Sequence, residues 1–368
     1  MLAIGLNDKS SSLVNEFPVI SVIVTTFKRC EYLLNALNSI KKQTISNKMY
    51  EVIVVKNFTD ELIDQKISEF GYLNIISEGS MGERLAIGIE KSRGRIISFL
   101  QDDDLFEPDK LEVTYNLFSD YDDLCFIHNG YRMIDSSGNL VGGTKRSKIK
   151  KDVAFSYELK HNLKNISLLI RAGCDFNLSC MSIRKNVIYP YLHDLKFING
   201  SDDSFVFFIS LFSEGSVLDY KRCLNRYRVH NSATAKSGTL GEMLKINSST
   251  FLRQIRAFET LKDISPCPNF DKVLYEGIES RKMALNIVAT SNVIKRSSIN
   301  NMLYLLAHHK TLNRGYFFRL ILANAIIMLD ENTGRRIYYW YVSRKYTNLI
   351  SQSNREPFER ELENSGVL

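Results

Sequence analysis

Apolar runs and amphipathic stretches alternate along the chain from residue 18 onward. The apolar runs are short and rich in branched aliphatic residues, as in strands that are buried on both faces. They cover residues 19–25, 51–55, 73–76 and 95–100. Residues 31–43 and 82–92 lie between them and repeat leucine and isoleucine at helical spacing. This order predicts an α/β fold with a mostly parallel central sheet and helices on both faces.

The pattern changes after residue 235. It becomes helix-periodic, with a break at the proline-containing segment 265–268, and no further strand pattern follows. At the other end, the first residues lack the basic start and apolar centre of a signal peptide. We therefore expect an N-terminal arm over residues 1–17, an α/β domain over residues 18–235 and a helical C-terminal domain over residues 236–368.

Composition narrows the class of protein. With 44% hydrophobic and 24% charged residues in 368, the chain has the make-up of a globular protein larger than one typical domain. The net charge of +7 favours acidic partners, but the basic residues are dispersed, so we expect no nucleic acid partner. The six cysteines show no C-x-x-C spacing, which predicts a reduced, cytoplasmic protein without a zinc site.

The most apolar late segment, residues 316–329, is shorter than the roughly 20 residues that cross a bilayer. It also contains Arg319 and Asn324, so we expect a buried helix there. The alternative is a helix that lies on the cytoplasmic face of a membrane, because residues 335–345 are both aromatic and basic.

Candidate chemistry begins with the acidic run Gln101-Asp102-Asp103-Asp104, directly after the strand at 95–100. Ligands of parallel sheets bind beyond the carboxyl ends of the strands. Crowded carboxylates repel one another unless a cation neutralises them, and Mg²⁺ or Mn²⁺ prefers such oxygen ligands. The alternative interpretation is an acidic helix N-terminus, where carboxylates favour the helix dipole.

Three segments together resemble glycosyltransferase family 2: P-V-I-S-V-I-V-T-T-F-K-R, E-V-I-V-V-K-N and I-S-F-L-Q-D-D-D-L-F-E-P-D-K-L. The resemblance covers roughly residues 18–235 and implies a GT-A nucleotide-binding domain. It further implies an inverting, metal-dependent transfer of a sugar, with Mn²⁺ or Mg²⁺ as cofactor. The donor would be a nucleoside-diphosphate sugar, and the acceptor a hydroxyl of a glycan, a polysaccharide or a lipid-linked saccharide.

The resemblance also implies which residues bind the nucleotide. Thr25 and Phe27 fall at the places that the family presents to the base. Asn57 belongs to the pair after the second strand, where Lys56 replaces the usual acidic residue. Arg84 falls in the register of a diphosphate contact on the next helix.

The metal and ribose positions come from the acidic run. Asp102 matches the family's ribose contact, Asp103 its metal ligand, and Asp104 its final acidic position. Gln101 stands where many members have another aspartate. Downstream, His230 matches the histidine of a Y-R-x-H-x-x-S segment and is a further candidate metal ligand.

An inverting transfer needs a base that accepts the proton of the attacking hydroxyl. The segment Asn199-Gly200-Ser201-Asp202-Asp203 resembles the family's acidic pair ahead of an apolar helix, with Asp203 at the base position. Without the resemblance, the same segment would be a capped helix start.

Two other functions stay open at this point. A sugar nucleotidyltransferase would also use an α/β sheet and acidic metal ligands, although the glycine-rich phosphate loop of that class does not follow the first strand. A non-catalytic nucleotide- or sugar-binding module on the same fold is the second. A dinucleotide oxidoreductase is disfavoured, because no G-x-G-x-x-G follows a strand.

Overall fold

The structure is a computed structural model, and it describes residues 18–28, 30–141, 151–230, 240–288, 302–304, 306–307, 314–329 and 333. The expected N-terminal arm, the expected boundary between residues 235 and 236 and the aromatic, basic segment 335–345 lie outside these residues. The domain limits therefore stay predictions.

The first half of the central sheet is parallel, as predicted, but its edge strand at residues 73–76 is largely exposed and not buried as expected. Its strands run in the order β3-β2-β1-β4. They are β1 (Ile20–Thr25), β2 (Tyr50–Lys56), β3 (Leu73–Ile76) and β4 (Ile96–Gln101). Thr25 lies opposite Val55 on one side and Gln101 on the other, so the segments that follow β1, β2 and β4 meet at one edge.

The second half of the sheet is mixed. Within the described residues the sheet has nine strands, in the order β3-β2-β1-β4-β8-β6-β9-β5, and β7 pairs with β9. The added strands are β5 (Leu105–Phe106), β6 (Leu124–Ile134), β7 (Val153–Phe155), β8 (Met181–Arg184) and β9 (Ser216–Arg228). At the centre of the sheet, β8 is antiparallel to both of its neighbours, β4 and β6. β6 therefore runs in the same direction as β4.

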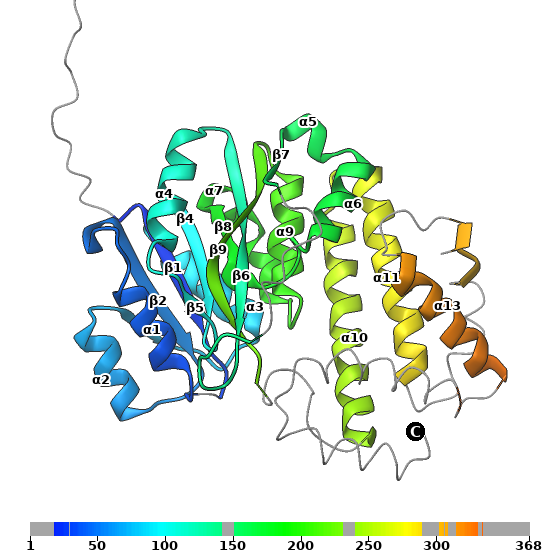
Figure 1. The fold of residues 1–368 in the computed structure, drawn as a ribbon, viewed down its shortest axis with the longest axis horizontal. Coiled ribbons are helices and arrows are strands. Elements are labelled where there is room, and N and C mark those ends of the chain that lie inside the picture. Colours follow the sequence, from blue (N-terminus) through cyan, green and yellow to red (C-terminus); the bar gives the residue numbers. More distant parts are fainter. Residues whose placement is uncertain are drawn as a thin grey trace, which may run out of the picture.

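Helices cover both faces of the sheet (Figure 1). Those with defined limits are α1 (Leu33–Lys41), η1 (Asn47–Met49), α2 (Glu61–Glu69), α3 (Met81–Lys91), α4 (Lys110–Asp120), α5 (Tyr157–Lys160), α6 (Leu163–Ala172), η2 (Leu178–Cys180), α7 (Lys185–Ile188), η3 (Tyr189–Tyr191), α8 (Leu192–Lys196), α9 (Asp202–Phe212), α10 (Leu240–Asp263), α11 (Pro268–Val288) and α13 (Arg314–Leu329). One core lies under α1, α2 and α4, and the other under α3 and α9. Apolar residues at helical spacing, such as Leu33 and Leu37 in α1, supply the buried faces.

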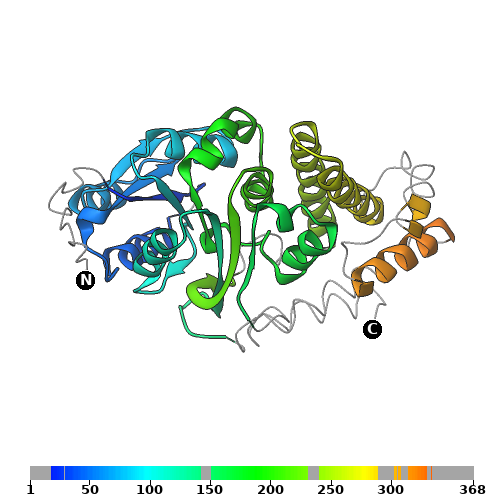
Figure 2. The same cartoon turned by 90° about the horizontal axis from the view of Figure 1, so that it is seen from above.

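The C-terminal part is helical, as predicted, and continues the core of the sheet domain. Phe258 of α10 packs against Phe208 of α9, with ring centroids 5.7 Å apart. Phe270 of α11 packs against Phe212 at 5.0 Å. Figures 1 and 2 show α10, α11 and α13 on the side of α6 and α9, far from α1 and α2.

Helix α13 is half buried. Phe317 and Leu320 pack against α11, whereas Phe318 and Leu322 are 61% and 58% exposed. Within the described residues, no helix combines the length and the apolar character needed to cross a membrane. The expected buried helix at 316–329 is therefore present, but one apolar side of it is exposed.

Candidate active site

The acidic run lies where β4 ends, and its three carboxylates have different surroundings. Asp102 is buried, and its Oδ2 accepts a hydrogen bond of 2.6 Å from Thr26 Oγ1. The Asp103 side chain is 14% exposed, and its Oδ2 lies 3.2 Å from Nε2 of His230. Asp104 is fully buried, and its Oδ1 accepts the backbone N–H of Arg228 at 3.0 Å. The geometry thus brings together Asp103 and His230, two of the candidate metal ligands.

The pKa of the Asp104 carboxyl is raised because the side chain is buried. Burial, together with the negative charge of Asp103, raises the pKa of the Asp104 carboxyl to about 8. A carboxyl that keeps its proton near neutral pH is a weaker ligand for a cation than an ionised one. The metal role of Asp104 stays a prediction, and Asp103 and His230 are the better placed pair.

Residues beyond β1 and β2 form the side expected to meet the nucleotide. Phe27 is 45% exposed, and the guanidinium of Arg84 lies 4.9 Å from the centre of its ring. Lys28 has a φ of +53°, and its N–H donates to Oδ1 of Asn57 at 2.7 Å. Asn57 therefore fixes the turn that presents Phe27. Thr25 is buried within β1.

Arg84 is buried, with 2% of its surface exposed, and donates to the carbonyl of Gly79. Its Nε has no hydrogen-bond partner among the described residues. Burial lowers the pKa of the guanidinium, while the carboxylates of Asp102 and Asp202 act in the opposite direction. Arg84 thus lies within electrostatic reach of both the acidic run and the acidic pair that begins α9.

The end of α8 and the residues after it are held against α3. Ser80 caps α3 by accepting the N–H of Glu83 at 3.1 Å, and its hydroxyl also donates to the carbonyl of Ile198. Gly82 N–H donates to the same carbonyl at 3.0 Å, and a Cβ at Gly82 would lie 2.0 Å from the Leu195 carbonyl oxygen. Only glycine fits there, and this close approach fixes the loop that leads to Asp203.

Asp203 is partly buried in the first turn of α9. Its Oδ1 accepts the N–H of Ser204 at 2.8 Å, and its Oδ2 accepts the N–H of Asn177 at 3.2 Å. Burial, followed by the charge of Asp202, raises the pKa of Asp203 to about 7. A carboxyl with that pKa is ionised at the upper end of the physiological range and can accept a proton there.

A short turn over residues 177–179 joins the two acidic groups. Asn177 donates its N–H to Asp203, and Ser179 Oγ accepts the N–H of Gln101 at 3.0 Å. One short turn therefore contacts both the base candidate and the end of β4. Asn177 has a φ of +64°, and the asparagine itself, a residue type that tolerates this backbone conformation, is the sequence signal for that turn. Thr26 was missed because its neighbour Thr25 matched the family position.

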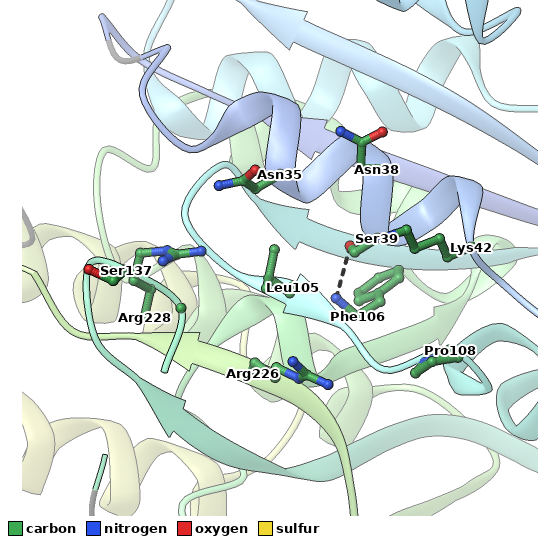
Figure 3. Close-up of a pocket in the computed structure, with 11 residues that line it drawn as sticks. Asn35, Asn38, Ser39, Lys42, Leu105, Phe106, Pro108, Ser137, Arg226 and Arg228 are labelled. Atoms are coloured by element: carbon green, nitrogen blue, oxygen red, sulfur yellow. Dashed lines mark hydrogen bonds between the residues drawn. The ribbon is translucent and has the colours of Figure 1, made fainter. Parts of the chain in front are cut away.

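A cavity of about 570 Å³ adjoins the acidic run on the side of α1 (Figure 3). Asn35, Asn38 and Lys42 of α1 line one wall, and Arg226 and Arg228 of β9 line another. Arg228 also donates from Nε to the carbonyl of Asp103 at 2.9 Å. None of the expected site residues lines this cavity, so it lies beside the candidate active site.

Part of the sequence matches a known protein family. The model of the family described as Glycosyl transferase family 2 matches residues 21–187. Residues 21–187 of this chain form a glycosyltransferase family 2 region. The matched region contains the acidic run and ends before Asp203 and His230. The roles of those two residues therefore rest on geometry and on the resemblance of their segments.

Relatives and solved structures agree with this family. The chain is 26% identical over 266 residues to an uncharacterized glycosyltransferase of Rickettsia prowazekii, covering 66% of this chain and 80% of that relative. It is 23% identical over 265 residues to one of Rickettsia bellii, covering 69% of this chain but only 36% of that relative. Residues 1–349 of S. aureus TarS, in complex with UDP-GlcNAc, superpose with a TM-score of 0.52 at 12% identity. That match covers 88% of this chain and 91% of the other, and confirms the predicted fold.

Proposed function

We propose that this family 2 glycosyltransferase transfers a sugar, with inversion, from a nucleoside-diphosphate sugar to a hydroxyl group of a saccharide acceptor. One observation carries the proposal. Residues 177–179 contact Asp203 at one end and the end of β4 at the other, so a base with a pKa of about 7 stands beside an acidic run. This is the pairing that an inverting transfer requires, because one group must take the acceptor proton while another region holds the leaving diphosphate.

Asp103 and His230 fit a divalent cation. The carboxylate oxygen and the imidazole nitrogen are 3.2 Å apart, and the Asp103 side chain is partly exposed to an incoming donor. Carboxylate and imidazole together suit Mn²⁺ and are compatible with Mg²⁺. A cation bound there would supply positive charge to the diphosphate as it leaves. In the free protein, Asp103 and His230 hold each other in place.

The donor side is the group of residues around Phe27. The exposed ring offers a stacking surface that accepts any base, and Arg84 backs it with positive charge. Asp102, fixed by Thr26, is the proposed ribose contact. Asn57 shapes the turn after β1 through the N–H of Lys28, and Thr25, the last residue of β1, is a proposed base contact. The buried Nε of Arg84 lacks a partner in the described chain, which suits a phosphate oxygen.

The acceptor side is aromatic. Phe176 precedes Asn177, the residue whose N–H binds Asp203, and it is 42% exposed. Its ring lies edge-on to Tyr227 at 5.5 Å and near Tyr131 at 6.1 Å. Such a supported, exposed ring suits the apolar face of a sugar ring, so we propose a saccharide, free or lipid-linked, as acceptor.

A peripheral membrane position belongs to the same proposal. The exposed Phe318 and Leu322 lie one helical turn apart on α13 and form an apolar strip that a membrane surface can cover. Within the described residues, Cys30, Cys125, Cys174, Cys180 and Cys267 form no disulfide, which agrees with a reducing compartment. We therefore propose a cytoplasmic enzyme that reaches the cytoplasmic face of a membrane.

A donor screen tests the transfer. UDP-, GDP- and dTDP-sugars are compared by thermal shift with and without Mn²⁺, since a bound ligand raises apparent stability by mass action. The best donor is then incubated with saccharide acceptors, and the anomeric configuration of the product is read by NMR. Metal-dependent transfer with inversion is expected. Full activity in excess chelator would exclude the metal role, and retention of configuration would exclude Asp203 as a simple base.

Membrane contact has a separate test. Flotation with vesicles that contain anionic lipid should carry the protein upward, and Phe318→Ser should weaken that recovery. Equal recovery of the variant, or no flotation of the unaltered chain, would contradict the proposed contact.

A further inference from the structure

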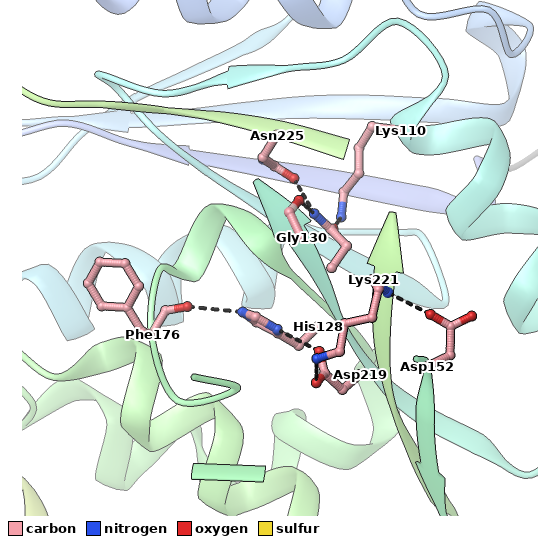
Figure 4. Close-up of polar contacts among 9 residues, drawn as sticks. Lys110, His128, Gly130, Asp152, Phe176, Asp219, Lys221 and Asn225 are labelled. Atoms are coloured by element: carbon pink, nitrogen blue, oxygen red, sulfur yellow. Dashed lines mark hydrogen bonds and ion pairs between the residues drawn. The ribbon is translucent and has the colours of Figure 1, made fainter. Parts of the chain in front are cut away.

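A second cluster of potential metal ligands lies on elements other than the acidic run. It consists of His128 in β6, Cys174 after α6 and Asp219 in β9, and all three side chains are buried. One ligand atom from each residue lies within 4.8 Å of the others. His128 and Asp219 are register partners of the parallel strands β6 and β9, so the sheet itself sets their spacing. Figure 4 shows the two side chains facing each other across the strands.

The hydrogen bonds of His128 leave one ring nitrogen directed at a carboxylate. Nε2 lies 3.1 Å from the carbonyl oxygen of Phe176, and because a carbonyl only accepts, Nε2 carries the hydrogen. Nδ1 of the neutral ring then directs its lone pair at Oδ1 of Asp219, 3.4 Å away. Two electron-rich atoms that face each other require a cation between them or a second proton on the ring. A ring N–H held by a carbonyl is also the arrangement that orients metal-binding histidines.

The spacing matches zinc. Zinc binds nitrogen and oxygen at about 2.0–2.2 Å in tetrahedral geometry, which places two such ligand atoms roughly 3.4 Å apart. The observed separation of Nδ1 and Oδ1 is 3.4 Å. The sulfur of Cys174 completes a set of imidazole, thiolate and carboxylate, a combination that suits zinc better than Mg²⁺ or Ca²⁺.

We propose that His128, Cys174 and Asp219 bind a structural Zn²⁺ ion, with water as the fourth ligand. A thiolate and a carboxylate balance the charge of the ion. The other oxygen of Asp219, Oδ2, binds the ammonium group of Lys221, so Lys221 orients the carboxylate and leaves Oδ1 toward His128. When the ion binds, the Zn–S bond forms and the thiol proton of Cys174 passes to solvent.

The ion would connect β6 and β9 to the loop that supports the proposed base. Cys174 lies three residues before Asn177, whose N–H binds Asp203, and Phe176 between them already accepts from His128. Zinc would therefore fix the loop at a second point. The sequence suggested no zinc site because the ligands are far apart along the chain, and only the sheet brings them together.

Metal titration of the full-length protein tests the site. Excess Mg²⁺ is kept present to occupy the acidic run, and Zn²⁺ or Co²⁺ is added. One Zn²⁺ per chain is expected to bind and to release at least one proton, measured by calorimetry in two buffers. Co²⁺ should give the near-ultraviolet absorption of a thiolate-to-cobalt transition. Absence of that absorption in the unaltered protein would overturn the proposal in favour of a protonated His128 bound to Asp219 and Lys221.

Two cysteine variants provide the comparison. Cys174→Ser should lose the cobalt–thiolate absorption and bind Zn²⁺ at least about tenfold more weakly. The half-buried Cys267→Ser should retain both, because Cys267 lies outside the cluster. Asp103→Ala should also keep this zinc, which separates the site from the proposed sugar transfer. Equal zinc affinity of Cys174→Ser and the unaltered chain would refute the site. If Cys174→Ser does not fold, the cobalt spectrum of the unaltered chain alone decides between the two outcomes.

Discussion

Asp203→Asn is the most informative single change, because it should abolish transfer and yet stabilise the protein at high pH. The amide cannot take the acceptor proton, so kcat should fall by about 10²- to 10⁴-fold, the usual contribution of a general base. Donor affinity should stay unchanged, because Asp203 lies on the acceptor side of the proposed site. In the unaltered enzyme, kcat/KM should fall tenfold per pH unit below about pH 7 as Asp203 becomes protonated.

The size of the stabilisation follows from the pKa. The folded chain raises the pKa of Asp203 from 3.8 to about 7, so it holds this proton more tightly than the unfolded chain does. Stability therefore falls as the pH rises between these values, by about 1.4 kcal/mol per unit. Asparagine does not titrate and escapes this loss. It also leaves one N–H, of Ser204 or of Asn177, without an acceptor, which costs about 1–3 kcal/mol at every pH.

The decisive quantity is how the difference in free energy of unfolding between the two proteins changes with pH. The cost of the lost hydrogen bond is the same at every pH and cancels from that change. From pH 5 to pH 8, the free energy of unfolding of Asp203→Asn should improve by roughly 3 kcal/mol relative to the unaltered protein. Urea denaturation at both pH values measures it. Asp120→Asn, at an exposed carboxylate at the end of α4, serves as control. A difference that does not change with pH would refute the argument from burial.

Three further outcomes are expected. Asp103→Ala should lower metal-dependent kcat/KM by at least about 100-fold, and unchanged activation by Mn²⁺ would contradict its metal role. Thr26→Val should remove the hydrogen bond that Oδ2 of the buried Asp102 accepts, reducing the free energy of unfolding by about 1–3 kcal/mol and raising the Kd of the sugar donor by calorimetry. Phe176→Ala should raise the acceptor KM by an amount equivalent to about 1 kcal/mol and leave donor binding intact; a change in donor Kd alone would place the ring elsewhere.

The sequence predicted the parallel half of the sheet because its strands carry the signal themselves. Continuous aliphatic runs such as 52–55 place apolar side chains on both faces of a strand, and the helices between them have one apolar side. The mixed half could not be predicted in the same way. Whether β8 enters antiparallel to β4 depends on pairings between residues far apart in the chain, such as Ile97 with Ile183. Local patterns contain no information about such pairings.

The same limit applies to the site. The acidic run is visible because its members are adjacent, and the structure brings Asp103 to His230 as the family resemblance implied. Sequence could not distinguish the buried Asp104 from the partly exposed Asp103, because that difference arises from the approach of Arg228. Sequence also could not show that Arg84, a charged residue on a helix, is buried.

Backbone strain connects these residues. Among the described residues other than glycine, positive φ occurs at Lys28, Asn177 and Ser201. Each lies within two residues of a proposed functional side chain, and each costs about 1–2 kcal/mol relative to a relaxed backbone. Each is also held by a hydrogen bond: Lys28 N–H to Asn57, Asn177 N–H to Asp203, and Phe205 N–H to the carbonyl of Ser201. Strain that neighbouring contacts maintain is typical of sites where geometry matters more than stability. The turns, and not only the acidic side chains, therefore define the proposed centre.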